Sequence, residues 1–150
     1  MMHRWAARLL VLALCTLVPS HARSQQSGQD RTTGSALGQN YPNPFNPETR
    51  IPFTIGGYPN CADPGRQYRV SLRIYNVLAQ LVAVPVLQGS TANGVAGGQP
   101  LLNLSLTCGE YTAYWDGKIM RSGREAASGI YGARLEVNGN PIMRKMTVRK

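Results

Sequence analysis

Alternation of apolar and polar residues is the feature that most constrains this chain, because it recurs from residue 51 almost to the C-terminus. The alternating apolar sets are Ile51/Phe53/Ile55, Val70/Leu72/Ile74, Val82/Val84/Val86, Tyr111/Ala113/Trp115, Tyr131/Ala133/Leu135/Val137 and Met146/Val148, with Leu102/Leu104/Leu106 as one further candidate. Successive side chains of a strand point to opposite faces, so a period of two predicts strands with one buried face. No convincing helical stripe occurs after residue 24.

Turn signals separate these candidate strands. Asn138-Gly139-Asn140-Pro141 predicts a tight turn between two strands, and Asp116-Gly117 turns the chain after Trp115. Residues 89–99 form a polar, glycine-containing stretch typical of an exposed loop, and Pro85 argues for an edge position. About seven short strands with one apolar face each are most economically buried as two packed sheets. We therefore expect an all-β, immunoglobulin-like antiparallel β-sandwich with Leu72, Ile74 and Trp115 in its core.

The first 24 residues have the pattern of a cleavable signal peptide. Arg4 and Arg8 precede an apolar run over 9–18, and Ala22-Arg23-Ser24 places small residues where a signal peptidase reads them. The alternative is an N-terminal core helix, which the flanking arginines disfavour. The apolar run is too short to cross a bilayer, which takes about 20 residues. The expected organisation is a signal peptide over 1–24, a flexible polar linker over 25–36 and one sandwich domain over 37–150, with no transmembrane segment in the mature chain.

Two cysteines, Cys61 and Cys108, remain after removal of the signal peptide. An even pair in an exported chain predicts one disulfide, and both residues lie in turn-like stretches outside the strand patterns. The alternative is two buried free thiols.

Charge and composition bound the function. The formal net charge is +9, and loss of Arg4, Arg8 and Arg23 leaves 9 − 3 = +6, which suits either a soluble basic surface or an anionic partner. Both histidines, His3 and His21, fall in the signal peptide, so the mature chain has no imidazole for general-base catalysis or zinc binding. It has no phosphate-binding glycine loop, and its acids are scattered. We expect no enzymatic activity, no cofactor and no metal.

A proline-rich segment precedes the first strand pattern. Tyr41, Pro42, Asn43, Pro44 and Phe45 are its centre, and close prolines exclude a helix and most ladder hydrogen bonds. We expect it to lie extended along a surface, with Tyr41 and Phe45 as apolar anchors. It serves either as a rigid lead-in to the domain or as a docking segment.

Four motifs carry a resemblance to a known family. They are Gln39-Asn40-Tyr41-Pro42-Asn43-Pro44-Phe45-Asn46-Pro47, Leu72-Arg73-Ile74-Tyr75-Asn76-Val77-Leu78, Trp115-Asp116-Gly117, and Ser128-Gly129-Ile130-Tyr131 with the closing Lys145-Met146-Thr147-Val148-Arg149-Lys150. In this order they resemble the C-terminal sorting domain of type IX secretion cargo. They equally resemble the immunoglobulin-like domain of the flagellar hook-capping protein family. The resemblance covers residue 37 to the end.

The resemblance implies export in two steps. A signal peptide reaches the periplasm, and the folded domain is then an address read by the outer-membrane type IX translocon and its sorting protease. In the family the domain is often clipped and replaced by an anionic lipopolysaccharide anchor, so the product is secreted or held at the outer-membrane surface. The positions that match the family's recognition motifs are Gly129, Tyr131, Gly139, Lys145 and Lys150.

Individual motif residues also have structural interpretations. Ala79 stands where the family usually has a turn glycine, which costs little if its φ is negative. The terminal lysines are either the solvated face of a last strand or part of an exposed edge that a receptor pairs with.

Two other functions compete with sorting. One is a stand-alone structural or adhesive module that binds protein or glycan at the cell envelope through loops such as residues 89–99. The other is nucleic-acid binding through the positive charge, which is disfavoured because the aromatic residues mostly occupy core positions and leave no evident stacking platform.

Overall fold

The computed structural model describes residues 29–30, 32–89 and 95–150. The expected signal peptide and most of the polar centre of the 89–99 loop lie outside these residues. The described chain is all-β and contains no helix, and therefore none that could cross a membrane. Its strands are β1 (Gln29–Asp30), β2 (Ser35–Leu37), β3 (Thr49–Ile55), β4 (Gln67–Asn76), β5 (Leu81–Ala83), β6 (Val86–Leu87), β7 (Leu104–Thr107), β8 (Gly109–Trp115), β9 (Gly129–Val137) and β10 (Asn140–Val148).

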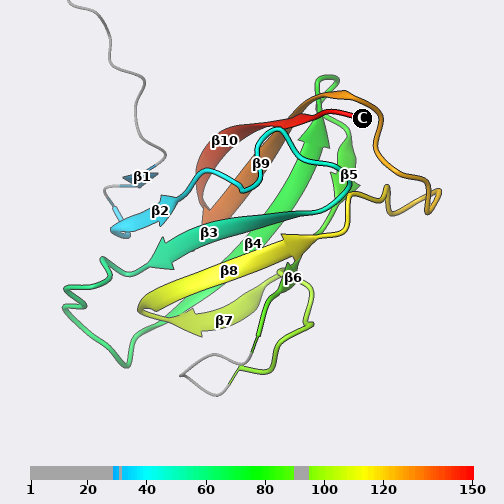
Figure 1. Cartoon of the computed structure of the whole chain (residues 1–150). Helices are drawn as coiled ribbons and strands as arrows, with labels where there is room; N and C mark the ends of the chain where they lie inside the picture. Colours follow the sequence, from blue (N-terminus) through cyan, green and yellow to red (C-terminus); the bar gives the residue numbers. More distant parts are fainter. Residues whose placement is uncertain (1–28, 31, 90–94) are drawn as a thin grey trace, which may run out of the picture.

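These strands form the two antiparallel sheets of a β-sandwich (Figure 1). The first sheet has the order β1-β2-β3-β8-β6, and the second has the order β10-β9-β4-β5 with β7 also on β4. The expected tight turn joins β9 to β10, and Asn138 (φ 50°) and Gly139 (φ 86°) supply its two positive φ angles. The predicted fold class, an all-β antiparallel sandwich, is confirmed, although the described residues form ten strands where about seven were expected.

The core lies between the sheets and follows the period-two pattern. Buried and half-buried residues alternate without exception along β3, and the same alternation runs through most of β8 and β9. Leu72 and Ile74 are fully buried and Trp115 is 3% exposed, so the three expected core residues lie in the core. Burial of these apolar faces is the main term that stabilises a fold without helices.

The alternation predicted one strand from Val82 to Val86. The structure divides this stripe between two strands. The chain leaves the second sheet after β5 and enters the first sheet at β6, crossing between them at Val84 and Pro85. Pro85 has no N–H to give to a ladder, although its carbonyl accepts a hydrogen bond from the N–H of Leu101. A proline inside the stripe therefore marks a crossing between sheets.

The leucine stripe after the 89–99 loop is also shorter than predicted. β7 begins at Leu104, and Leu102 lies before it with 48% of its surface exposed. Leu101 is fully buried instead, and its carbonyl accepts a hydrogen bond from the N–H of Leu72. The apolar phase therefore shifts by one residue between Leu101 and Leu104.

Part of the segment expected to be a flexible linker is ordered as β1 and β2. Leu37 is 1% exposed at the end of β2, and Ser35 is fully buried. The Ser35 hydroxyl accepts hydrogen bonds from the Thr33 hydroxyl and the Gly56 N–H, which satisfies a buried polar group. The polar composition of this stretch did not predict a strand, because the polar side chain of Ser35 is buried together with its hydrogen-bond partners.

Cys61 and Cys108 form a disulfide, with Cα atoms 5.9 Å apart. Cys61 lies in the connection from β3 to β4, and Cys108 lies between β7 and β8. The bond therefore ties a long connection to the start of the strand that carries Trp115, as predicted.

Candidate recognition surface

The proline-rich segment was expected to lie extended along a surface, and it crosses from one sheet to the other (Figure 1). Tyr41 forms a bridge with Arg50 in β3, through two backbone hydrogen bonds of 2.9 Å. Phe45 forms a parallel bridge with Val148 in β10, where its N–H donates to the carbonyl of Thr147. The segment from residue 41 to 47, called the lead-in below, therefore closes one side of the sandwich.

A buried amide fixes the start of the lead-in. Asn40 is 2% exposed, and its Nδ2 group donates to the carbonyl of Pro42 and to the Thr49 hydroxyl, each at 3.0 Å. Thr49 in turn donates to the same Pro42 carbonyl at 3.1 Å. Because a buried amide without partners is costly, this network favours one path for the chain.

The two expected apolar anchors differ in burial. Phe45 is 1% exposed, whereas half the surface of Tyr41 is exposed. The Phe45 ring meets Trp115 edge-on at 5.4 Å, and Trp115 meets Tyr131 in the same way at 5.8 Å. Three motifs far apart in the sequence therefore share one aromatic cluster.

Polar tips orient the other two rings of this cluster. The Trp115 indole N–H donates to the carbonyl of Lys118 at 3.0 Å, and the Tyr131 hydroxyl donates to the carbonyl of Ala127 at 3.0 Å. Both acceptors lie in the connection from β8 to β9, so the aromatic cluster holds this connection against the sandwich.

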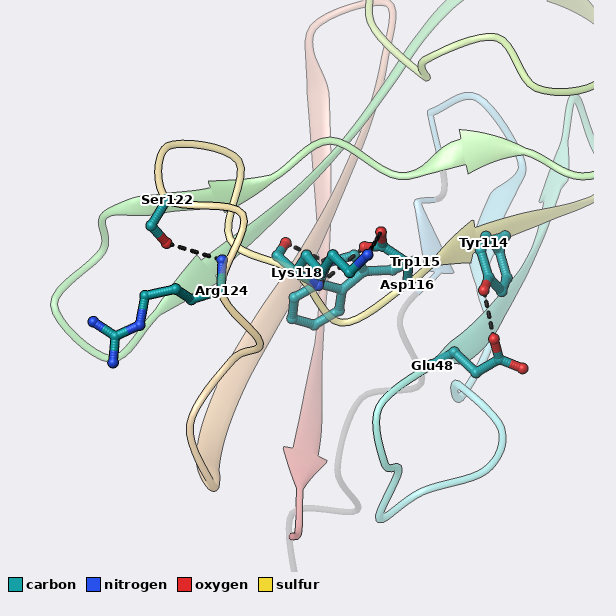
Figure 2. Close-up of polar contacts among 7 residues, drawn as sticks. All are labelled: Glu48, Tyr114, Trp115, Asp116, Lys118, Ser122 and Arg124. Atoms are coloured by element: carbon teal, nitrogen blue, oxygen red, sulfur yellow. Dashed lines mark hydrogen bonds and ion pairs between the residues drawn. The ribbon is translucent and has the colours of Figure 1, made fainter.

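Gly117 turns the chain directly against the lead-in. Its φ is 76°, and an ideal Cβ there would lie 1.9 Å from the carbonyl oxygen of Pro47. The Asp116 carboxylate accepts a hydrogen bond from the N–H of Lys118, which stabilises the turn (Figure 2). The turn of the Trp-Asp-Gly motif therefore packs directly against the backbone of the Asn-Pro motif.

The Ser-Gly-Ile-Tyr motif contacts the C-terminus. Gly129 pairs with Val148, and Tyr131 pairs with Met146. The backbone N–H of Lys150 donates to the Ser128 hydroxyl at 3.0 Å, and its ammonium group lies 3.0 Å from a carboxylate oxygen of Glu125. This places the last residue of the chain beside the connection from β8 to β9.

The motif from Leu72 to Leu78 also ends beside the Ser-Gly-Ile-Tyr motif, because Asn76 at the end of β4 pairs with Tyr131. The Asn76 side chain accepts hydrogen bonds from the N–H groups of Leu78 and Gln80, which closes the turn to β5. Ala79 in this turn has a φ of 57°. An alanine would have cost little stability here if its φ were negative, but its φ is positive.

The expected recognition residues do not all lie together. Gly129, Tyr131 and Lys150 lie at one end of the sandwich with Trp115 and the lead-in. Gly139 occupies the β9–β10 turn at the other end, and Lys145 is exposed in the middle of β10, opposite Gly132. We call the end that carries the lead-in, Trp115, Gly129 and Lys150 the recognition end.

The edge of β10 is not open for strand pairing over residues 145–149, contrary to one interpretation of the terminal lysines. Gln39 donates to the carbonyl of Lys145, and Asn43 accepts from the N–H of Thr147. Phe45 bonds both the Thr147 carbonyl and the Arg149 N–H through its backbone. A receptor would therefore meet side chains here, because Gln39 and the lead-in already occupy the backbone groups.

A tyrosine–carboxylate pair lies near the recognition end. The Tyr114 hydroxyl donates to a carboxylate oxygen of Glu48 (Figure 2). This hydrogen bond, assisted by desolvation and by the charges of Glu48 and Asp116, raises the pKa of Tyr114 above its usual range. The pair joins β8 to the residue just before β3.

Within the described residues, no group of three or more His, Cys, Asp or Glu side chains is arranged to hold a metal ion. Two polar contacts near the recognition end stabilise turns. Ser122 accepts from the N–H of Arg124, and Asp116 accepts from that of Lys118 (Figure 2).

Sequence reasoning did not identify a hollow of about 220 Å³ on the outer face of the second sheet. Val77, Ile130, Gly132 and Met143 are among its lining residues, and the three apolar side chains are at least half exposed. A signal was present, because Ile130 and Met143 are apolar residues on the faces of their strands that alternation assigns to solvent.

Comparison with known proteins returned no match. No protein-family model matches the chain, and neither a curated protein nor a solved structure does. The resemblance to sorting domains therefore rests on the motif residues, and what it implies for function is a proposal.

Proposed function

We propose that this is a non-enzymatic exported protein whose sandwich is a sorting domain, recognised by the outer-membrane machinery of type IX secretion for export or surface attachment. The observation that carries the proposal is the convergence of motifs. Segments around residues 45, 76, 115, 129 and 150 meet at the recognition end, although they are far apart in the sequence.

Convergence matters because a surface assembled from distant segments exists only in the folded chain. The contacts of Phe45 with Trp115, and of Lys150 with Glu125, are absent from any extended stretch of the sequence. An address of this kind would be read after folding in the periplasm. That fits an exported domain with a disulfide, since disulfides form in oxidising compartments.

The charge of the domain fits an anionic surface. The expected mature chain carries +6, and Arg121, Arg124, Arg149 and Lys150 are exposed at or near the recognition end. Anionic lipopolysaccharide is therefore a candidate second partner, and the translocon with its sorting protease is the first.

A reporter fusion tests the proposal. A fluorescent reporter is placed between residues 1–24 and residues 25–150 and expressed in a host with an active type IX system. The matched control carries an unrelated disulfide-bonded sandwich of similar size in place of residues 25–150. We expect the native fusion at the surface or in the medium and the control in the periplasm. Retention of both in the periplasm would contradict the proposal.

One observation favours the second candidate function, a structural or adhesive module. A polar hollow of about 730 Å³ lies at the other end of the sandwich, and its lining includes Arg69, Asn103, Ser105, Glu136 and Asn138. Amide, hydroxyl and charged groups of this kind are suited to the hydroxyls of a glycan.

Titration with the surface polysaccharide of the host distinguishes this candidate from sorting. Adhesion through the polar hollow predicts binding that Ser105→Ala and Arg69→Ala weaken, with no effect of Lys150→Ser. Absence of binding by the native domain would remove this candidate.

A further inference from the structure

The hollow over Gly132 combines exposed apolar walls with a floor that lacks a side chain. Val77, Ile130 and Met143 are 76%, 50% and 59% exposed, respectively, and all three line the hollow. Contact of large, grouped apolar side chains with water is unfavourable in free energy, and it is relieved when another group covers them. Grouping around a concavity is typical of a surface that receives a side chain of a partner.

Gly132 makes the concavity. It lies between Tyr75 of β4 and Lys145 of β10, its register partners on either side. An ideal Cβ at Gly132 would meet only the end of the Met143 side chain, at 3.4 Å, which is ordinary contact. The backbone therefore tolerates a larger residue here, and the absence of a side chain leaves space on the outer face.

The surroundings of the hollow are positively charged. Lys145 is among its lining residues, as is Arg144, whose Nε–H donates to the carbonyl of Leu37, and none of the described lining residues is acidic. Further along the same outer face, Arg73 and Arg134 share one carboxylate, that of Glu136, at 3.8 Å and 3.4 Å. The face therefore has more positive than negative groups and attracts an anionic partner.

We propose that the hollow over Gly132 is the docking site for an acidic segment of a protein partner, which inserts one apolar side chain between Ile130 and Met143 and places carboxylates near Lys145. The inference rests on the proposed function, and it assigns this partner to the export machinery. A second copy of the chain is disfavoured because two cationic faces repel each other. A lipid surface is an outcome that the test addresses, because Val77 and Leu78 in the turn after β4 are also exposed apolar side chains.

Point variants of the reporter fusion test this inference. Gly132→Leu fills the hollow, and Lys145→Glu reverses the charge beside it. The matched controls are Thr112→Leu on the outer face of the first sheet and Arg66→Glu in the exposed β3–β4 connection. Thermal unfolding of each purified variant shows that the fold is retained.

We expect Gly132→Leu and Lys145→Glu to lower the surface-to-periplasm ratio at least about tenfold, as for loss of a central interface contact. Both controls should match the native fusion. If the native fusion is exported and Gly132→Leu is exported equally well, the inference fails while the proposed function stands. If the native fusion itself stays in the periplasm, the function fails and the inference with it.

Two measurements on the purified domain test the other occupants. Binding to phosphatidylglycerol vesicles that Gly132→Leu abolishes would assign the hollow to lipid and overturn the proposal. A dimer in sedimentation that Gly132→Leu dissociates would assign it to a second copy, with the same consequence. The proposal predicts a monomer, and it predicts that Gly132→Leu does not change vesicle binding.

Discussion

Gly117 carries the tightest steric constraint among the described glycines, since its ideal Cβ would lie 1.9 Å from the Pro47 carbonyl. Gly123 is a matched control, because its φ of 65° is also positive but no atom lies within 4 Å of its ideal Cβ. We expect Gly123→Ala to lower the free energy of unfolding by about 1 kcal/mol through backbone strain alone. Gly117→Ala should cost at least about 2 kcal/mol more, because the lead-in must move.

Urea unfolding followed by Trp115 fluorescence measures both variants, since Trp115 is the one tryptophan after the expected cleavage point. If both variants lost the same free energy of unfolding, a Cβ at Gly117 would not clash with Pro47.

Ala79 offers a change in the opposite direction. An alanine at a φ of 57° carries strain that glycine does not, although glycine adds entropy to the unfolded chain. Ala79→Gly should therefore raise the free energy of unfolding by about 0.5 to 1 kcal/mol. Ala127→Gly, exposed and without a positive φ, should leave it unchanged or lower it. A lower urea midpoint for Ala79→Gly would contradict the strained turn.

The lead-in is the element whose role differs most from its sequence pattern. Phe45→Ala should lower the free energy of unfolding by about 3 to 5 kcal/mol, because a buried ring against Trp115 is replaced by a cavity. Tyr41→Ala, which removes a half-exposed ring of the same segment, should cost less than about 1 kcal/mol. Similar small effects in urea unfolding would mean that the lead-in is a detached surface segment.

The disulfide acts at the scale of connections. It closes a stretch with a sequence separation of 47, for which chain entropy predicts a stabilisation of about 4 kcal/mol. The double variant Cys61→Ser with Cys108→Ala should lose about that much in urea unfolding. Addition of reductant to the native domain should lower its stability and leave the variant unaffected. An unchanged midpoint under both conditions would show that the bond adds nothing.

Alternation predicted most elements because one face of each strand is buried. β3, β8 and β9 follow it directly, and β4 follows it except at the buried Ser71. It failed where a local feature overrode the period. Pro85 moves the chain to the other sheet, and the buried hydroxyl of Ser35 makes a strand from a polar stretch. Such effects depend on partners distant in the sequence, which a local pattern does not contain.

For the whole molecule, the motifs predicted some positions in the structure but not the contacts between segments that are distant in the sequence. Trp115 was expected in the core, but its contacts with Phe45 and Tyr131 join segments up to 86 positions apart in the sequence. The lead-in covers the edge of β10 through the bridge of Phe45 with Val148, and this pairing has no local signature. The hollow over Gly132 likewise depends on β4, β9 and β10 being neighbours.

The most direct test of the account is the location of the native reporter fusion in two isogenic strains, one with an active type IX translocon and one without it. Surface fluorescence and the periplasmic fraction are measured in both, with the disulfide intact. The account predicts surface or secreted fusion in the first strain and periplasmic, folded fusion in the second. The same location in both strains would contradict it, because the recognition end would then not be an address for this machinery.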